Sequence, residues 1–231
     1  MYYFFSNIYS YLIFILPALL LSLYAQAKVK GTYAKYGKMY NKKGLTGAMA
    51  ARMILDQNGL QHVKIEHIAG NLTDHFDPRT NVVRLSDSVY GSGSVAAVGV
   101  AAHECGHAVQ YAQSYTPMKI RGAIIPITNI GSTLSIPLFF LGLLFSIPSL
   151  VLVGIGLFAL VAVFQLVTLP VEFNASSRAL KTLEASNYLS LEELGGAKRV
   201  LSAAAMTYVA ALIMSIAQLL RLIFIARRND R

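Results

Sequence analysis

The chain has 231 residues, of which 55% are hydrophobic and only 13% are charged, and its formal net charge is +9. Soluble domains usually carry about a quarter charged residues, so this composition excludes an ordinary soluble protein and indicates a membrane protein. No recognition motif accompanies the basic excess, so we expect no nucleic-acid partner. Basic residues beside apolar spans usually set membrane topology instead.

Four segments are long and apolar enough to cross a bilayer, which takes about 20 residues. They are residues 4–24, 125–146, 149–169 and 203–225. Only Ile147 and Pro148 separate the second segment from the third, which predicts a tight hairpin. The sequence leaves open whether this hairpin spans the bilayer fully or re-enters on one face.

The first span reads as a retained anchor. Residues 1–10 carry no basic residue, unlike a signal peptide, whereas Lys28 and Lys30 follow the span. The positive-inside rule then places the polar stretches 25–122 and 170–202 in the cytoplasm, because both are rich in basic residues. An even number of crossings lies between the two stretches, so they share one face in any four-span arrangement.

The first polar stretch contains two helical patterns and two short strand patterns. Thr46 can cap a helix over 46–58, and the pattern from 95 to 113 is also helical. Alternation over 62–68 and the apolar residues of 82–85 predict strands. Between the strands, 77–81 is typical of a turn.

The fragment His103-Glu104-Cys105-Gly106-His107 lies in the second predicted helix and has the HExxH pattern. Residues i and i+4 of a helix are about 40° apart, so both imidazoles can bind one Zn²⁺. Glu104 is then placed to take a proton from the attacking water. Cys105 points away from the metal and is expected to be a small buried residue. The pattern therefore predicts zinc as cofactor and Glu104 as catalytic base.

A catalytic zinc site needs a third protein ligand. No histidine follows His107, and the only aspartate after Asp87 is Asp230 at the tail, so a glutamate remains. Glu192 and Glu193 belong to a capping-box pattern that begins at Ser190. Glu184 lies among polar residues, as on a solvated helix face.

Glu172 differs from these glutamates because it follows the third span directly. We expect it to open a helix at the membrane surface, on the side where the histidine pair lies. A carboxylate in the first turn of a helix can also serve only to stabilise that helix. We predict that Glu172 is the third zinc ligand.

The HExxH motif and several other segments of the chain resemble those of the YugP-type neutral zinc metallopeptidases of bacterial membranes. The chain is more distantly similar to the HtpX-like membrane proteases. The resemblance covers nearly the whole chain. The segments that carry it are Phe76-Asp77-Pro78-Arg79, Val83-Arg84-Leu85-Ser86, Ala101-Ala102-His103-Glu104-Cys105-Gly106-His107-Ala108, Glu172-Phe173-Asn174-Ala175-Ser176-Ser177-Arg178-Ala179, Thr207-Tyr208-Val209-Ala210-Ala211 and Leu219-Leu220-Arg221.

The resemblance implies a gluzincin-like fold, in which a second helix supplies a glutamate ligand from an ExxxD pattern. Glu172 takes the ligand position, and Ser176 stands where the aspartate would be. Ser176 or Asn174 is then expected to provide the hydrogen bond that orients the ligands. The strand at 82–86 is expected to form an exposed sheet edge to which a peptide substrate adds.

Tyr208, near the start of the last span, fits two roles. It can donate a hydrogen bond to the oxyanion of the reaction, or it can anchor the helix at the membrane interface. Anchoring is the commoner role for a tyrosine at such a position.

These observations predict a mainly α membrane protein whose four transmembrane helices and small α+β catalytic region form a single domain over 1–231. The predicted function is that of a zinc-dependent endopeptidase in the bacterial cell membrane, with its active site on the cytoplasmic face. Its expected partners are the lipid bilayer and protein or peptide substrates, membrane proteins among them. The alternative is a zinc-binding scaffold or chaperone-like protein without turnover, although such a site has no use for Glu104 as a base. Few polar groups in the spans support a third possibility, a small transporter, and the oligomeric state stays open.

Overall fold

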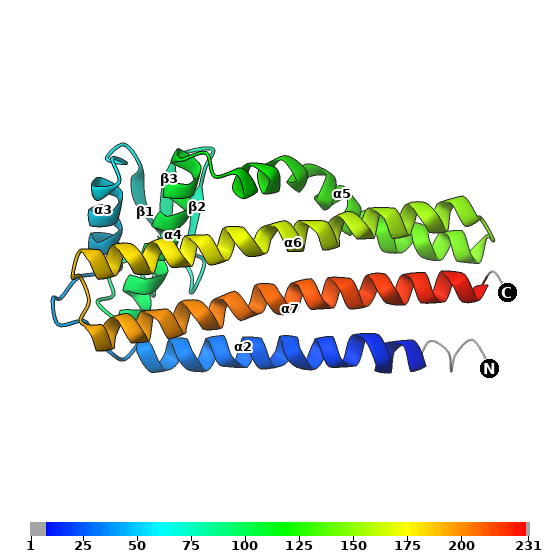
Figure 1. The fold of residues 1–231 in the computed structure, drawn as a ribbon, viewed down its shortest axis with the longest axis horizontal. Coiled ribbons are helices and arrows are strands. Elements are labelled where there is room, and N and C mark those ends of the chain that lie inside the picture. The colour runs from blue at the N-terminus through cyan, green and yellow to red at the C-terminus, as the bar shows by residue number, and fades with distance from the viewer. Residues whose placement is uncertain (1–7, 230–231) are drawn as a thin grey trace. The chain divides into compact units, whose positions relative to one another are not determined.

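The computed structural model describes residues 8–229 (Figure 1), so positions 4–7 of the first predicted span lie outside the described residues. A short π-helix (Tyr11–Ile15) leads directly into α2. The other helices and strands, in chain order, are α2 (Leu16–Tyr36), α3 (Gly47–Gln57), β1 (Lys64–Ile68), β2 (His75–Asp77), β3 (Val82–Ser86), α4 (Val95–Ala112), α5 (Thr116–Leu144), α6 (Pro148–Ala185) and α7 (Leu191–Asn229).

The chain divides into two compact units, and the described part of the first consists of residues 8–26, 120–169 and 207–229. We call it the membrane unit. It contains parts of α2, α5, α6 and α7. Each of these four helices, with α2 extended at its start by the π-helix, is long and apolar enough to cross a membrane. The four predicted spans and the mainly α membrane fold are therefore confirmed. A small core cluster within this unit contains Phe139, Val151 and Leu222.

Helix α6 corrects one prediction, because Glu172 does not open a new helix. The third span continues through Pro170 into the polar region, and Glu172 lies in the interior of one helix that ends at Ala185. A proline removes a single backbone hydrogen bond and restricts the residue before it, and a long helix can absorb that loss. Glu172 is therefore held by a helix that is already formed on both sides of it.

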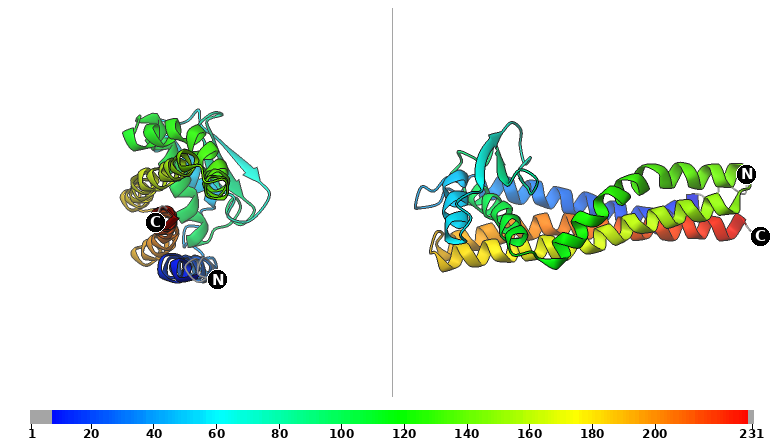
Figure 2. Two further views of the ribbon diagram at one scale, coloured as in Figure 1. Left: turned by 90° about the vertical axis from the view of Figure 1, so that its right-hand side faces the viewer. Right: turned by 90° about the horizontal axis from the view of Figure 1, so that it is seen from above.

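The second unit, which we call the catalytic unit, consists of Ala27–Lys119 and Pro170–Met206. Its core is built from α3, the sheet, α4 and the adjoining parts of α6 and α7, with Ile54, Leu55 and Leu85 among its fully buried side chains. Figures 1 and 2 show the strands beside α3 and α4, and α4 contacts both β2 and β3. The predicted α+β region is thus present.

The sheet has the order β1-β3-β2, with β1 parallel and β2 antiparallel to β3. Val83 of β3 pairs with Ile65 on one side and with Phe76 on the other. The expectation that 82–86 forms an exposed edge is therefore wrong, because β3 is the central strand. Strand β2, which the sequence did not predict, is the edge strand that lies beside α4.

Capping residues explain where several helices begin. The Thr46 side chain accepts a hydrogen bond from the backbone N–H of Met49, as predicted. The capping box at the start of α7 is also present: Glu193 accepts from the Ser190 N–H at 2.7 Å, and its other oxygen accepts from the Lys42 N–H at 2.8 Å. Glu193 therefore has a structural role.

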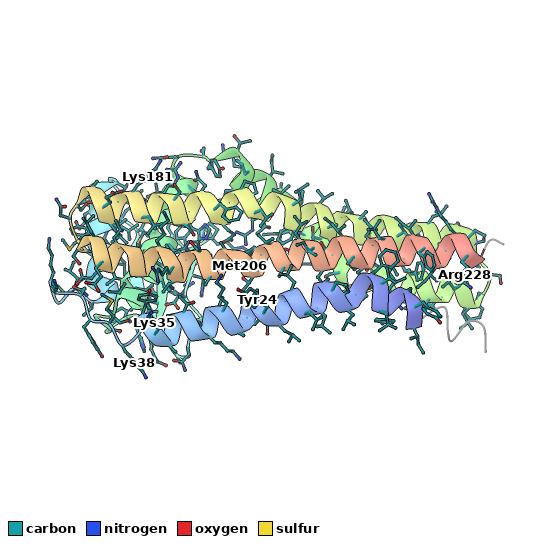
Figure 3. The ribbon with its side chains drawn as sticks, turned by 60° about the horizontal axis from the view of Figure 1, so that its bottom comes forward. Tyr24, Lys35, Lys38, Lys181, Met206 and Arg228 are labelled. Atoms are coloured by element: carbon teal, nitrogen blue, oxygen red, sulfur yellow. The ribbon has the colours of Figure 1, made fainter. Side chains whose placement is uncertain are left out.

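Exposed lysines gather on the catalytic unit. Lys35 lies in the last turn of α2, Lys38 follows that helix, and Lys181 lies on α6 (Figure 3). All three side chains are exposed. They belong to the stretches that the positive-inside argument assigns to one face of the membrane.

Candidate metal centre

Helix α4 carries the HExxH fragment through the core of the catalytic unit. Ser94 caps the helix by accepting a hydrogen bond from the Ala97 N–H at 3.2 Å. Most of its residues are buried, which fits its small apolar sequence. His103 and His107 lie one turn apart and project from the same face, with their ring centroids 4.7 Å apart.

Glu172 of α6 reaches both imidazoles. Its Oε2 lies 3.3 Å from His103 Nε2 and 3.5 Å from His107 Nε2. One ligand atom from each of the three residues lies within 4.8 Å of the others. Two imidazole nitrogens and one carboxylate oxygen are a donor set typical of zinc. The structure thus brings together the three residues that the sequence singled out, although Glu172 follows His107 by a whole helical hairpin.

Burial and charge act in opposite directions on His107. Burial by itself lowers the pKa of this imidazole, because it disfavours the charged form. The hydrogen bond to Glu172 and the carboxylates of Glu104 and Glu172 outweigh burial and raise the pKa of His107 above its ordinary value. The site therefore attracts positive charge at Nε2, where either a proton or a metal ion can bind.

Gly106, between the two histidines, allows α6 to approach α4 closely. A Cβ atom at this position would lie 2.5 Å from the backbone oxygen of Ala175. Since such a distance is impossible between real atoms, a side chain here would push the two helices apart. The small residue inside the motif therefore sets the distance between Glu172 and the imidazoles.

Glu104 points from α4 toward the edge strand. Its Oε2 accepts a hydrogen bond from the backbone N–H of Phe76 at 3.0 Å, and the residue is only 8% exposed. Strand β2 therefore orients the carboxylate that we predict to act as the base. The neighbouring Cys105 is fully buried on the opposite side, with its thiol 3.5 Å from the Ala51 carbonyl oxygen, and burial raises the pKa of this thiol. A thiol held neutral in the core is not a metal ligand.

The predicted orienting residues differ in what they contact. Ser176 Oγ lies 3.1 Å from His103 Nδ1, so this hydroxyl stands at one imidazole. Asn174 contacts neither histidine in the hydrogen bonds of the described residues and instead accepts from Gln110 and Arg178. Tyr208 belongs to the membrane unit, and both of its predicted roles stay predictions.

Gln110 is a site residue that the sequence interpretation missed. Its Oε1 lies 3.0 Å from His107 Nδ1, and the residue is completely buried. The signal was its spacing: position i+3 from His107 places an amide on the same face of α4. Two other histidines have different contacts: His67 pairs with Asp87 on the surface, and the side chain of His75 bonds the backbone oxygen of Thr73.

Comparisons with known proteins agree with this geometry. Residues 11–227 match the family described as "Putative neutral zinc metallopeptidase". The chain is 47% identical over 210 residues to a protein of Bacillus subtilis (strain 168) named "Putative membrane protease YugP", which covers 91% of this chain and 93% of the relative. No solved structure matches the chain. Because the family match extends over nearly all of the sequence, the chain belongs to this family of zinc metallopeptidases.

Proposed function

We propose that the protein is a membrane-embedded zinc endopeptidase of the HExxH class, in which His103, His107 and Glu172 hold the metal and Glu104 is the catalytic base. The observation that carries the proposal is the convergence of three ligand atoms within 4.8 Å of one another. They come from α4 and from the second half of α6, and α5 and the first part of α6 lie between them in sequence. The family and the B. subtilis relative support the same class of activity.

The side chains fit zinc in kind and number. Both imidazoles present Nε2 toward Glu172, and three protein ligands leave a fourth position for water or substrate, as in catalytic zinc sites. Zinc held there would lower the pKa of a bound water to near 7 and polarise the peptide carbonyl.

Glu104 is suited to carry the proton. As a general base it takes a proton from the attacking water, and as a general acid it returns that proton to the leaving amine. Its carboxylate is buried and its Oε2 is anchored by one backbone N–H, so the group has a fixed direction and its second oxygen, Oε1, is left for the water. A scaffold with a purely structural zinc would gain nothing from this arrangement.

We infer that the substrates are proteins or peptides, membrane proteins among them, and that the catalytic unit faces the bacterial cytoplasm. The charge supports this orientation, because the exposed Lys35, Lys38 and Lys181 all lie on the catalytic unit (Figure 3). Within the membrane unit, Tyr208 is assigned to interfacial anchoring in preference to the oxyanion.

The deciding experiment uses the purified full chain in detergent. Metal content is measured after loading with zinc, and casein is offered as a general substrate, with the Glu104→Gln variant and a chelator-treated sample beside the wild type. We expect about one zinc per chain and cleavage of casein by the wild type. Neither the Glu104→Gln variant nor the chelator-treated sample should cleave casein. Stoichiometric zinc without cleavage would favour the scaffold alternative, and absence of zinc would reject the site.

A further inference from the structure

A chain of hydrogen bonds runs from His107 to the surface of the catalytic unit. His107 Nδ1 lies 3.0 Å from Gln110 Oε1, and the Gln110 amide nitrogen donates to the Val171 carbonyl oxygen at 2.8 Å and to Asn174 Oδ1 at 3.0 Å. Asn174 Oδ1 also accepts from Arg178 Nε at 2.7 Å. The chain ends where Arg178 Nη1 donates to Gln113 Oε1.

Two groups in this series of hydrogen bonds can play only one role, either donor or acceptor. Their roles fix the orientation of the amide groups between them. A backbone carbonyl such as that of Val171 only accepts, so the atom of Gln110 that faces it must be the NH₂ group. A guanidinium only donates, so the Asn174 atom between Arg178 and Gln110 must be the oxygen. Both anchors give Gln110 the same orientation, with Oε1 toward His107.

We propose that Gln110 is a positioning residue that fixes His107 in the tautomer with a proton on Nδ1, and thereby presents the lone pair of Nε2 to the metal. An amide oxygen can only accept, so Nδ1 must donate, and in a neutral imidazole the other nitrogen then carries the lone pair. The inference rests on the zinc site proposed above and concerns how that site is prepared.

The two histidines differ in this respect. The partner of His103 Nδ1 is the hydroxyl of Ser176, which can either donate or accept. That contact therefore selects no tautomer. Gln110, by contrast, is completely buried, and its oxygen and both of its amide protons are used. The structure assigns the directional contact to His107 alone.

Removing Gln110 leaves the rest of the chain of hydrogen bonds in place. Asn174 Oδ1 keeps its bond to Arg178, and Val171 lies inside α6, where its carbonyl has a helical partner. The group that loses its hydrogen-bond partner is Nδ1 of His107. Substitutions at position 110 therefore report on this imidazole.

Three variants of the full chain separate positioning from simple packing. Gln110→Met keeps the size of the side chain and removes the acceptor for Nδ1–H. Gln110→Glu keeps an acceptor but turns its second oxygen toward the two acceptors on Val171 and Asn174, which costs stability. Gln113→Met removes the last partner of Arg178 in the same chain of bonds and is the matched control.

Zinc affinity is measured by competition with a chelator, and stability is measured by thermal unfolding of the metal-free protein. Loss of an outer hydrogen-bond partner typically costs about 10–100-fold in metal affinity, and we expect this loss in Gln110→Met. We expect Gln110→Glu to be the less stable variant and yet the tighter zinc binder. Gln113→Met should bind zinc like the wild type. If zinc affinity instead follows stability across both Gln110 variants, Gln110 is only a packing residue.

The tautomer itself is read by NMR on protein labelled with ¹⁵N-histidine, which carries only five labelled side chains. We expect a slowly exchanging proton on Nδ1 of His107 in the wild type and in Gln113→Met, and its loss in Gln110→Met. The signal is sought in the metal-free protein as well as in the zinc-loaded one. A wild type that shows this proton but binds no zinc would reject the proposed function and keep the tautomer. A neutral His107 imidazole with its proton on Nε2 and none on Nδ1 would overturn the inference.

Discussion

Gly106 of α4 lies directly against the backbone oxygen of Ala175 of α6, at a distance that leaves no room for a methyl group. This contact lies one residue before His107 and three residues after Glu172 along the respective helices. The separation of the two helices, and with it the size of the candidate metal site, is therefore set by a residue that has no side chain.

Gly106→Ala should separate α4 from α6 and weaken zinc binding together with the fold. Forcing a methyl group into a packed interface typically costs about 1–3 kcal/mol. Gly195→Ala is the matched control, because Gly195 lies inside α7 and an added Cβ meets nothing within 4 Å. That control should gain about 0.5–1 kcal/mol, since alanine favours helices. Thermal unfolding and zinc titration of both variants test this; equal behaviour would show that the close approach is not required.

Glu104→Gln should bind zinc normally and lose catalysis. The amide keeps the size of the side chain but cannot take a proton, and a positioned base contributes at least about 10²-fold to the rate. Casein cleavage and zinc content are measured on the same preparation. Glu184→Gln, at an exposed position of α6, is the control and should cleave at the wild-type rate. Near-normal turnover by Glu104→Gln would remove this residue from the mechanism.

Glu172→Ala should lower zinc affinity by more than the roughly 10–100-fold that loss of an outer partner causes, because a direct ligand is lost. Glu193→Ala should have the opposite profile. It should keep zinc but melt at a lower temperature, since Glu193 caps α7 and bonds the Lys42 N–H. A Glu172→Ala protein with wild-type zinc affinity would mean that another group completes the site.

Zinc affinity should fall as the pH is lowered, and the fall should begin above the ordinary histidine pKa of about 6.5. The hydrogen bond and carboxylates around His107 raise its pKa despite burial, so protons compete for Nε2 at a higher pH than usual. Each displaced proton weakens binding by about tenfold per pH unit below that pKa. Chelator competition at stepped pH values measures the profile. An affinity that is constant down to pH 6 would contradict this account.

Cysteine labelling tests the orientation in the membrane. Cys105 is fully buried, so a cysteine introduced elsewhere is the one accessible thiol among the described residues. Tyr40→Cys, at a position that is 71% exposed, should resist an impermeant thiol reagent in intact cells and react after permeabilisation. Arg228→Cys, at the exposed end of α7, should react in intact cells. The reverse pattern would place the catalytic unit outside the cell.

The parts of this protein that follow from local spacing could be predicted from the sequence. His103 and His107 share a helix face by period alone, Thr46 and Glu193 cap helices by local bonds, and apolar length predicts the four spans. Glu172 could be singled out as a candidate ligand by elimination, because few ligand-type residues follow His107.

Contacts between distant segments could not be predicted in the same way. Strand β2 has only three residues and owes its place to pairing with β3, so no alternation marks it. Gln110 lies at a suggestive spacing from His107, but its role depends on Val171 and Asn174, which lie more than 60 residues later. The continuity of α6 through Pro170 likewise depends on packing that outweighs one missing bond.

The separation of the three proposed ligands along the chain has a consequence for how the protein is made. A ribosome delivers His103 and His107 first, and the hairpin of α5 and the first part of α6 must emerge before Glu172 is translated. Until then the proposed donor set is incomplete, so a nascent chain cannot yet form the proposed zinc site. The proposed zinc site can therefore assemble only after the third membrane segment has been produced.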